Sequence, residues 1–159
     1  MSPQRTAIVI VASTRAAAGI YEDRSGPIAV EFLRRKGFDC PAARIVPDAD
    51  IAATVAAAFA EEPSVILTSG GTGLTQDDKT VEAVAPHITR ELPGIAVAFW
   101  QRGLESVPTA VASRAIAGVN DSTFAMTLPG STGGVKDGCA VLDKLIVPIV
   151  DMLEGVHEH

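Results

Sequence analysis

The sequence predicts an α/β fold with a central, mostly parallel sheet that helices cover on both faces. Two short apolar runs, Thr6 to Ala12 and Val65 to Leu67, have no polar face, which indicates strands that are buried on both sides. After each run, a loop of small or polar residues leads into a segment whose apolar residues recur every three or four positions, as they do in a helix. Strands that alternate with helices in this way are typical of a parallel sheet.

The first strand is expected to lead into Ser13-Thr14-Arg15 and a flexible run of small residues that ends at Gly19. A helix then begins at Ser25 or Gly26, since either residue can cap a helix, and Gly37 stops it. The N-terminal part of the chain is therefore a unit of strand, loop and helix.

The next segment, Phe38 to Val46, predicts a weaker strand, and its internal proline places it at the edge of the sheet. Pro47-Asp48-Ala49-Asp50 then precedes another helix. Either aspartate can cap that helix, and if Asp50 does so, Asp48 is left in the loop. In a parallel sheet this loop lies at the carboxyl ends of the strands, beside the glycine-rich loop that follows the next strand.

The chain is organised around the loop Gly70-Gly71-Thr72-Gly73, which precedes a helix with apolar residues from Val81 to Ile88. Glycines let a ligand approach the backbone closely, so the amides of this loop can point at an anion. A P-loop is excluded because Asp78 stands where its second glycine belongs, and a dinucleotide fingerprint is excluded because Gln76 stands at its last glycine. The loop therefore predicts a phosphate site of another type.

In the C-terminal half, Leu92-Pro93-Gly94 opens a helix, and Thr123 to Leu128 predicts a last clear strand. That strand leads into a second loop of small residues, Pro129 to Gly134, which also suits close approach of a ligand. The closing helix is expected to run from Val135 to about Glu154, with Pro148 kinking or dividing it. Its apolar surface is broad, so part of it is expected to pack on another subunit.

Composition narrows the class of protein. With 159 residues, 47% of them hydrophobic, we expect one domain with a substantial core over residues 1–159. No apolar run approaches the roughly 20 residues of a membrane span, and the N-terminus lacks a signal-peptide pattern, so we expect a cytoplasmic protein. Cys40 and Cys139 are expected to be buried, reduced thiols. A net charge of −6 argues against non-specific nucleic-acid binding, and an acidic protein that binds phosphates is expected to use amides, isolated cations and a divalent metal ion.

Four separated motifs resemble those of one family. Gly70-Gly71-Thr72-Gly73, followed by Asp78, Thr80 and Glu82, resembles the signature Gly-Gly-Thr-Gly-x-x-x-Arg-Asp-x-Thr-Pro-Glu of the MoaB/Mog family of molybdenum-cofactor biosynthesis, which is related to a domain of gephyrin. The other three motifs occur in family order: Ser13-x-Arg15 with Asp23-x-Ser25-Gly26-Pro27, then Ser113-Arg114 with Gly118, then Leu128-Pro129-Gly130-Ser131 with Val135. The resemblance covers nearly the whole chain.

Four positions depart from the family pattern. Thr14 replaces an acidic or amide residue, and Asp77 replaces a basic residue, which makes the glycine-rich loop more acidic. Val81 replaces a proline, and Gly133 replaces a nearby lysine. We expect Lys136 to substitute for that lysine as a contact for an anion.

The resemblance implies a three-layer α/β/α domain that assembles as a homotrimer. It also implies molybdopterin adenylyltransferase activity, in which ATP and molybdopterin give adenylylated molybdopterin and pyrophosphate. Because the reaction joins two anions, a metal ion held by carboxylates would neutralise their charge. Asp78 is the expected ligand of Mg²⁺ and ATP, with Asp48 as its partner. Asp77 is expected about 100° round a helix from Asp78, so the two cannot face one ligand equally.

The resemblance implies a further set of substrate-binding residues: Ser13, Gly70, Gly71, Thr72, Gly73, Thr80, Glu82, Ser113, Arg114, Pro129, Gly130 and Ser131. For Arg114 the residues alone leave open a surface ion pair or a cation directed at phosphates, and for Ser25 to Pro27 they leave open helix capping or a functional role. The function also has an alternative, a non-catalytic homologue that binds molybdopterin or a protein partner. Handover of the product to a molybdenum-inserting protein is a further open point.

Overall fold

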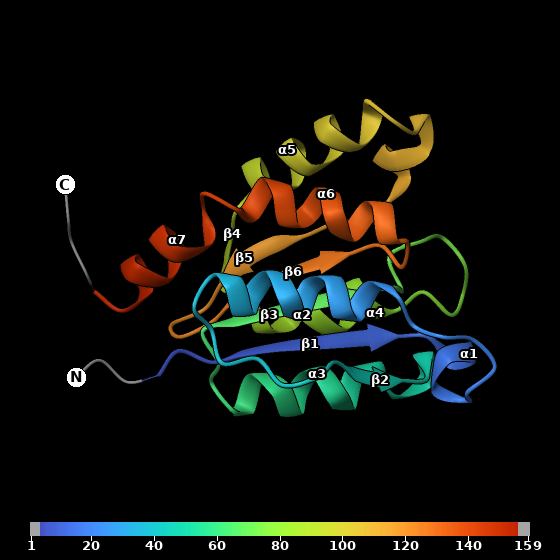
Figure 1. The fold of residues 1–159 in the computed structure, drawn as a ribbon, viewed down its shortest axis with the longest axis horizontal. Coiled ribbons are helices and arrows are strands. Elements are labelled where there is room, and N and C mark those ends of the chain that lie inside the picture. Colours follow the sequence, from blue (N-terminus) through green and yellow to red (C-terminus); the bar gives the residue numbers. More distant parts are fainter. Residues whose placement is uncertain (1–3, 156–159) are drawn as a thin grey trace.

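A six-stranded sheet flanked by helices forms the domain, which the computed structural model describes over residues 4–155 (Figure 1). The strands are β1 (Ala7–Ala12), β2 (Arg44–Val46), β3 (Val65–Ser69), β4 (Arg90–Glu91), β5 (Ala117–Val119) and β6 (Phe124–Leu128). The α-helices are α1 (Thr14–Ala17), α2 (Ser25–Arg35), α3 (Ile51–Ala60), α4 (Thr80–Val84), α5 (Pro93–Leu104), α6 (Thr132–Leu142) and α7 (Ile146–Leu153). Three short 3₁₀ helices complete the described elements: η1 (Asp48–Asp50), η2 (Ala85–His87) and η3 (Pro108–Ala112).

The order of strands in the sheet is β2-β1-β3-β6-β5-β4. Strands β2, β1, β3 and β6 run parallel, whereas β5 is antiparallel to β6 and β4 is antiparallel to β5. The mostly parallel sheet is therefore confirmed. An edge strand lies where one was predicted, but it covers only residues 44–46 of the expected 38–46, with a single bridge at Asp39 before it. The sequence did not predict β4 and β5, because two and three residues are too few to show an alternating pattern.

Helices cover both faces of the sheet, which confirms the three layers. On one face, α2, α5 and α6 bury Leu33, Phe99 and Leu142 against the strands. On the other face, α3 and α4 bury residues that include Val55 and Val84. Each central strand thus contributes alternate residues to two separate cores, and this is why β1 and β3 are buried along their whole length.

Two predictions about the segments that follow β1 and β3 were wrong. The run after β1 is not an irregular loop, because residues 14–17 form the short helix α1, whose first turn is capped by the Ser13 hydroxyl accepting from the Ala16 amide at 3.1 Å. The helix expected to reach Ile88 ends at Val84, since Pro86 cannot donate the next helical hydrogen bond.

The closing helix is divided, as predicted, but at a different place. Helix α6 ends at Leu142, and a turn over residues 143–145 separates it from α7. Pro148 lies inside the first turn of α7, where the missing amide would have no helical partner, so it does not cause the break.

Both cysteines are buried and unpaired, as expected. Burial raises the pKa of the Cys40 and Cys139 thiols to about 11, from an ordinary value of 9.0. Within the part of the chain that the structure describes, no helix has the length and apolar character needed to cross a membrane.

We expect the free energy of unfolding to fall between pH 9 and pH 11. A raised thiol pKa means that the folded state holds the proton more tightly, so the stabilisation is full below pH 9 and is lost as the pH rises toward the folded value of about 11. Urea unfolding across this range should show a loss of up to about 2 kcal/mol per thiol.

The double variant Cys40→Ala/Cys139→Ala is the control for this prediction. It retains every other group that titrates in alkali, so the difference between the two pH profiles isolates the thiols. Profiles that run parallel would contradict the assignment.

Candidate functional site

The predicted site loops meet at one edge of the sheet. Parallel strands β1, β3 and β6 have their carboxyl ends together, so the loops that begin at Ser13, Gly70 and Pro129 lie side by side at the end of the domain near α1 (Figure 1). The carboxyl edge of a parallel sheet is where such folds bind ligands.

Gly70 and Gly71 give the central loop its shape. Both have left-handed backbone conformations, with φ of 92° and 74°. The Gly70 amide donates to the Leu128 carbonyl at 3.0 Å, which ties β3 to β6 at the start of the loop. A Cβ atom at Gly70 would overlap the Ala12 carbonyl oxygen, and one at Gly71 would overlap the Thr80 hydroxyl. Only glycine fits at these two positions.

One cavity, which we call the glycine cavity, has a volume of about 440 Å³. Its walls are Gly70, Gly71, Thr72, Gly73, Leu74, Asp78, Thr109, Ala112, Ser113, Pro129 and Gly130. Glycines and other small residues therefore form most of its walls.

A second cavity, which we call the aspartate cavity, has a volume of about 560 Å³. Its walls are Ala12, Ser13, Thr14, Arg15, Asp48, Ala49, Gly71, Asp77, Asp78 and Lys79. Gly71 and Asp78 line both cavities, so the two adjoin at these residues. The structure thus brings Asp48 and Asp78 to one cavity, although 30 positions separate them in the sequence.

The two predicted carboxylates are held by different threonines. Oδ2 of Asp78 accepts from the Thr75 amide at 3.0 Å and from the Thr75 hydroxyl at 2.8 Å. Oδ2 of Asp48 accepts from the Thr14 hydroxyl at 2.9 Å, and the Asp48 amide donates back to that hydroxyl at 3.1 Å. Thr14, one of the departures from the family pattern, therefore fixes the position of Asp48.

The structure differs from the predictions for Asp50, as a helix cap, and for Asp77, as a helical residue. Asp50 occupies the cap position of α3, but its side chain makes no capping hydrogen bond. Asp77 and Asp78 both precede α4, so the helical separation of about 100° does not apply to them, and both line the aspartate cavity. This cavity therefore has three carboxylates, with Arg15 and Lys79 as its cations.

Arg114 holds the glycine-rich loop. Its Nε donates to the Gly73 carbonyl at 2.9 Å, one terminal nitrogen donates to the Asp78 carbonyl at 3.0 Å, and the other forms an ion pair with Glu82. The hydrogen bond from Arg114 lowers the pKa of the Glu82 carboxyl. Arg114 is not among the residues that line either cavity, so its guanidinium is committed to the loop rather than directed at a bound phosphate.

Three other predicted substrate contacts, Thr80, Glu82 and Ser131, also lie outside the walls of both cavities. Thr80 is fully buried behind Gly71. The Ser131 hydroxyl caps α6 by accepting from the Gly134 amide at 3.1 Å. The remaining predicted residues line one cavity or the other, and Ser113 is held there by a 2.9 Å hydrogen bond between its hydroxyl and that of Thr72.

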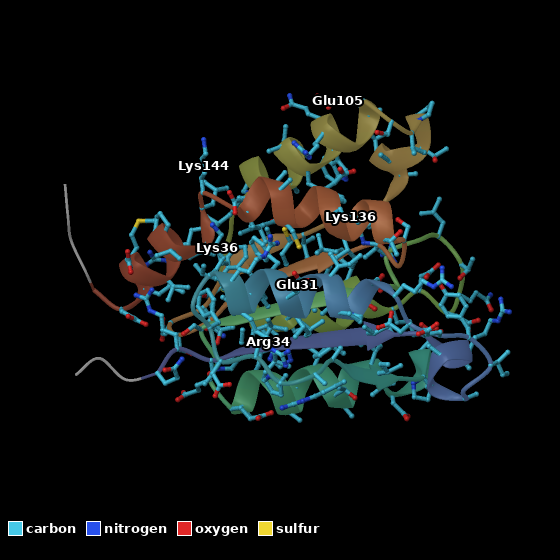
Figure 2. The ribbon with its side chains drawn as sticks, in the orientation of Figure 1. Glu31, Arg34, Lys36, Glu105, Lys136 and Lys144 are labelled. Carbon is cyan, nitrogen blue, oxygen red and sulfur yellow. The ribbon has the colours of Figure 1, made fainter. Side chains whose placement is uncertain are left out.

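Lys136 does not replace the lysine that is missing at Gly133. It lies on α6, labelled in Figure 2, in a separate cavity that Arg35 of α2 and Cys139 also line. Lys136 is not among the residues that line the glycine cavity or the aspartate cavity.

Ser69, which the sequence analysis did not single out, connects two of the loops through Ser25 and Pro129. The Ser69 hydroxyl, at the end of β3, lies 3.1 Å from the Pro129 carbonyl and 2.8 Å from the Ser25 hydroxyl. The Ser25 hydroxyl donates to Oδ1 of Asp23 at 2.9 Å, and the Gly26 amide donates to Oδ2 of the same carboxylate at 3.1 Å. The one available signal for Ser69 was its place, with the threonine before it, at the polar end of a strand that begins with three apolar residues.

The donor set fits a divalent cation that shares its ligands with a substrate. Within residues 4–155, no three His, Cys, Asp or Glu side chains are grouped so as to hold a metal ion alone. Mg²⁺ commonly takes one or two protein carboxylates and completes its shell with substrate phosphates and water. Asp48 and Asp78, on one cavity wall, match that requirement.

Comparison with known proteins gives consistent matches. The family model described as "Probable molybdopterin binding domain" matches residues 8–151. A molybdenum cofactor biosynthesis bifunctional protein of Chlorobaculum tepidum is 42% identical over 95% of this chain, but the chain spans about half (49%) of that relative. Molybdenum cofactor biosynthesis protein B of Staphylococcus aureus is 36% identical, with 97% of this chain and 90% of the relative covered. The molybdopterin biosynthesis Mog protein of Mycobacterium ulcerans has a solved structure with a TM-score of 0.90 and 38% identity, covering 97% of this chain and 99% of that one.

Replacing Gly70 by alanine is expected to cost at least about 2 kcal/mol of unfolding free energy, because the left-handed conformation alone costs an L-residue roughly 1–2 kcal/mol and the overlap with Ala12 adds to it. Urea denaturation measures the loss. Gly133→Ala is the matched control, since a Cβ there meets no atom within 4 Å and alanine favours a helix. Equal stability of the two variants would contradict the packing argument.

Removing the Arg114 side chain is expected to destabilise the protein by about 1–3 kcal/mol, because two loop carbonyls lose their donors. Arg114→Lys should recover little, since one ammonium group cannot replace a planar guanidinium with several donors. Arg102→Ala is the control: its ion pair with Asp137 is 3.5 Å long and half-exposed, so its loss should stay under about 1 kcal/mol. Thermal and urea unfolding measure the stability of both alanine variants. Equal losses of stability would contradict the role of Arg114 in holding the loop.

Proposed function

The chain belongs to the MoaB/Mog family of molybdenum-cofactor biosynthesis proteins, and on that premise we propose that it is a molybdopterin adenylyltransferase. It would convert ATP and molybdopterin to adenylylated molybdopterin and pyrophosphate. The observation that carries this proposal is the pair of cavities that adjoin at Gly71 and Asp78. One is lined mostly by glycines and other small residues, and the other contains three carboxylates.

Each cavity suits one of the two substrates. The glycine cavity offers amides and small side chains, which accommodate the terminal phosphate and flat ring system of molybdopterin. The aspartate cavity offers oxygen ligands for Mg²⁺, together with Arg15 and Lys79 for the phosphates of ATP. Placed in this way, the two anionic groups meet beside Asp78.

The reaction exchanges one bond to phosphorus for another. A terminal phosphate oxygen of molybdopterin bonds to the α-phosphorus of ATP, and the bond from that phosphorus to the bridging oxygen of the β-phosphate breaks. The leaving oxygen takes the electron pair and departs with pyrophosphate. Such transfer depends mainly on positioning and charge stabilisation, so the protein needs no nucleophile of its own.

Asp48 and Asp78 would hold Mg²⁺, which when bound neutralises phosphate charge and orients the transferred group. Thr14 and Thr75 keep these two carboxylates in place through the hydrogen bonds described above. Arg114 keeps Gly73 and Asp78 at a fixed separation across the loop. Thr14, Thr75 and Arg114 would therefore act on the substrates indirectly, by holding other residues of the site in place.

A non-catalytic homologue that binds molybdopterin or a partner is the second candidate, and Asp77 is the observation that favours it. Asp77 adds a third carboxylate to the aspartate cavity, where the family pattern has a basic residue. That charge would repel ATP phosphates. In either case we propose a cytoplasmic homotrimer, and in the catalytic case a handover of the product to a molybdenum-inserting protein.

Asp78→Asn is expected to lower ATP- and Mg²⁺-dependent adenylylation of molybdopterin by at least about 100-fold, because the amide keeps the shape of the carboxylate but not its charge. Asp48→Asn should also lower it. Asp50→Asn is the matched control, because Asp50 lies beside Asp48 in sequence but lines neither cavity. The assay follows adenylylated product and pyrophosphate.

Two results would change this conclusion. Full activity of Asp78→Asn would exclude its role as a metal ligand. Tight binding of molybdopterin by the wild type without any product would favour the non-catalytic homologue, and appearance of product in Asp77→Asn would then identify Asp77 as the cause.

A further inference from the structure

A buried chain of polar contacts joins three segments that are far apart in the sequence. It runs from the Asp23 carboxylate through the hydroxyls of Ser25 and Ser69 to the Pro129 carbonyl, with successive distances of 2.9, 2.8 and 3.1 Å. Ser25 and Ser69 are only 3% and 1% exposed, so water does not compete for these contacts. The chain thus connects the start of α2, the end of β3 and the loop after β6.

The last residue in this series of contacts, Pro129, lines the glycine cavity. Pro129 and Gly130 form one side of that cavity, and the loop from Gly70 to Gly73 forms another. The two sides approach closely at their base, where a Cβ on Gly130 would lie 3.5 Å from the Gly70 Cα. Ser69 immediately precedes Gly70, so its contact with Pro129 bridges the two walls.

This series of polar contacts has fewer hydroxyl protons than it has contacts. The two ends, a carboxylate and a carbonyl, only accept hydrogen bonds when Asp23 is ionised, and the two serines supply one proton each. Three contacts therefore share two protons. Ser25 donates to the charged carboxylate, which forms the stronger bond, so the Ser69 proton is divided between Ser25 and the Pro129 carbonyl. The 3.1 Å contact to Pro129 is the longest of the three.

We propose that Ser69 and Ser25 are positioning residues that set the separation of the two walls of the glycine cavity, and with it the affinity for molybdopterin. This inference rests on the proposed function only for the identity of the ligand. Neither serine lines the aspartate cavity, so the binding of Mg-ATP should not depend on them.

Because two protons serve three contacts, we expect replacement of the two serines to have opposite effects on the Pro129 wall. Ser69→Ala removes the bridge to Pro129 and frees that wall. Ser25→Ala removes the competing acceptor, so the Ser69 proton goes wholly to the Pro129 carbonyl and that wall becomes better fixed. Asp23 keeps its amide donors from Ser25 and Gly26 in both variants. A merely structural role would give both variants the same sign.

The test combines hydrogen exchange of the ligand-free protein with steady-state kinetics and molybdopterin binding. In Ser69→Ala, we expect amides 130–134 to exchange several-fold faster and the KM and Kd for molybdopterin to rise about tenfold, with kcat and the KM for Mg-ATP unchanged. In Ser25→Ala, the same amides should exchange more slowly and the KM and Kd for molybdopterin should not rise. Ser122→Ala, an exposed serine in the turn before β6, is the control and should match the wild type.

The outcomes separate this inference from the proposed function. A wild type that binds molybdopterin without turnover would contradict the transferase, while hydrogen exchange and the molybdopterin Kd would still decide the role of the serines. Faster exchange in both variants, or equal rises in the KM for molybdopterin and for Mg-ATP, would overturn the inference. A wild type that does not bind molybdopterin would overturn both.

Discussion

The contact of backbone with backbone at the carboxyl ends of β1, β3 and β6 is the constraint on which the rest of the site depends. Gly70 lies against the Ala12 carbonyl and donates to the Leu128 carbonyl, so three strands converge on one residue without a side chain. This packing places a loop from each strand at the same edge. The doubly buried sheet beneath supplies the rigidity, because a register error in any of these strands would expose apolar residues or separate the loops.

The two cavities differ in charge because different side chains line them. In the glycine-rich loop, the Gly73 and Asp78 carbonyls are occupied by Arg114, and Glu82 offsets the charge of that arginine. Asp78 is therefore the one charged residue among the described residues that line the glycine cavity. The aspartate cavity gathers its three carboxylates from two separate segments, one with Asp48 and one with Asp77 and Asp78. One edge of the fold therefore holds a glycine-rich surface and an acidic surface next to each other.

Features that arise from local pattern could be predicted from the sequence, and features that arise from distant contacts could not. The apolar runs at residues 6–12 and 65–67 predicted the central strands because burial on both faces leaves no polar position. The short β5 has no such pattern and exists because β6 offers it a partner. The same distinction applies to the site. The rule for parallel sheets placed the Asp48 loop beside the Gly70 loop, and the family resemblance pointed to Asp48 and Asp78, whereas the partners of Arg114 and Ser69 depend on side-chain directions that no spacing reveals.

The strand order has a consequence for synthesis of the chain. β6 lies between β3 and β5 in the sheet, yet roughly 55 residues separate the end of β3 from its start, so β1, β2 and β3 emerge from the ribosome first. At translation rates of about 5–20 residues per second, the edge of β3 stays unpaired for about 3 to 11 seconds. An unpaired edge of a strand that begins with three apolar residues is prone to pair with other chains. The nascent protein therefore passes through an interval in which chaperone binding competes with aggregation, before β6 closes the sheet.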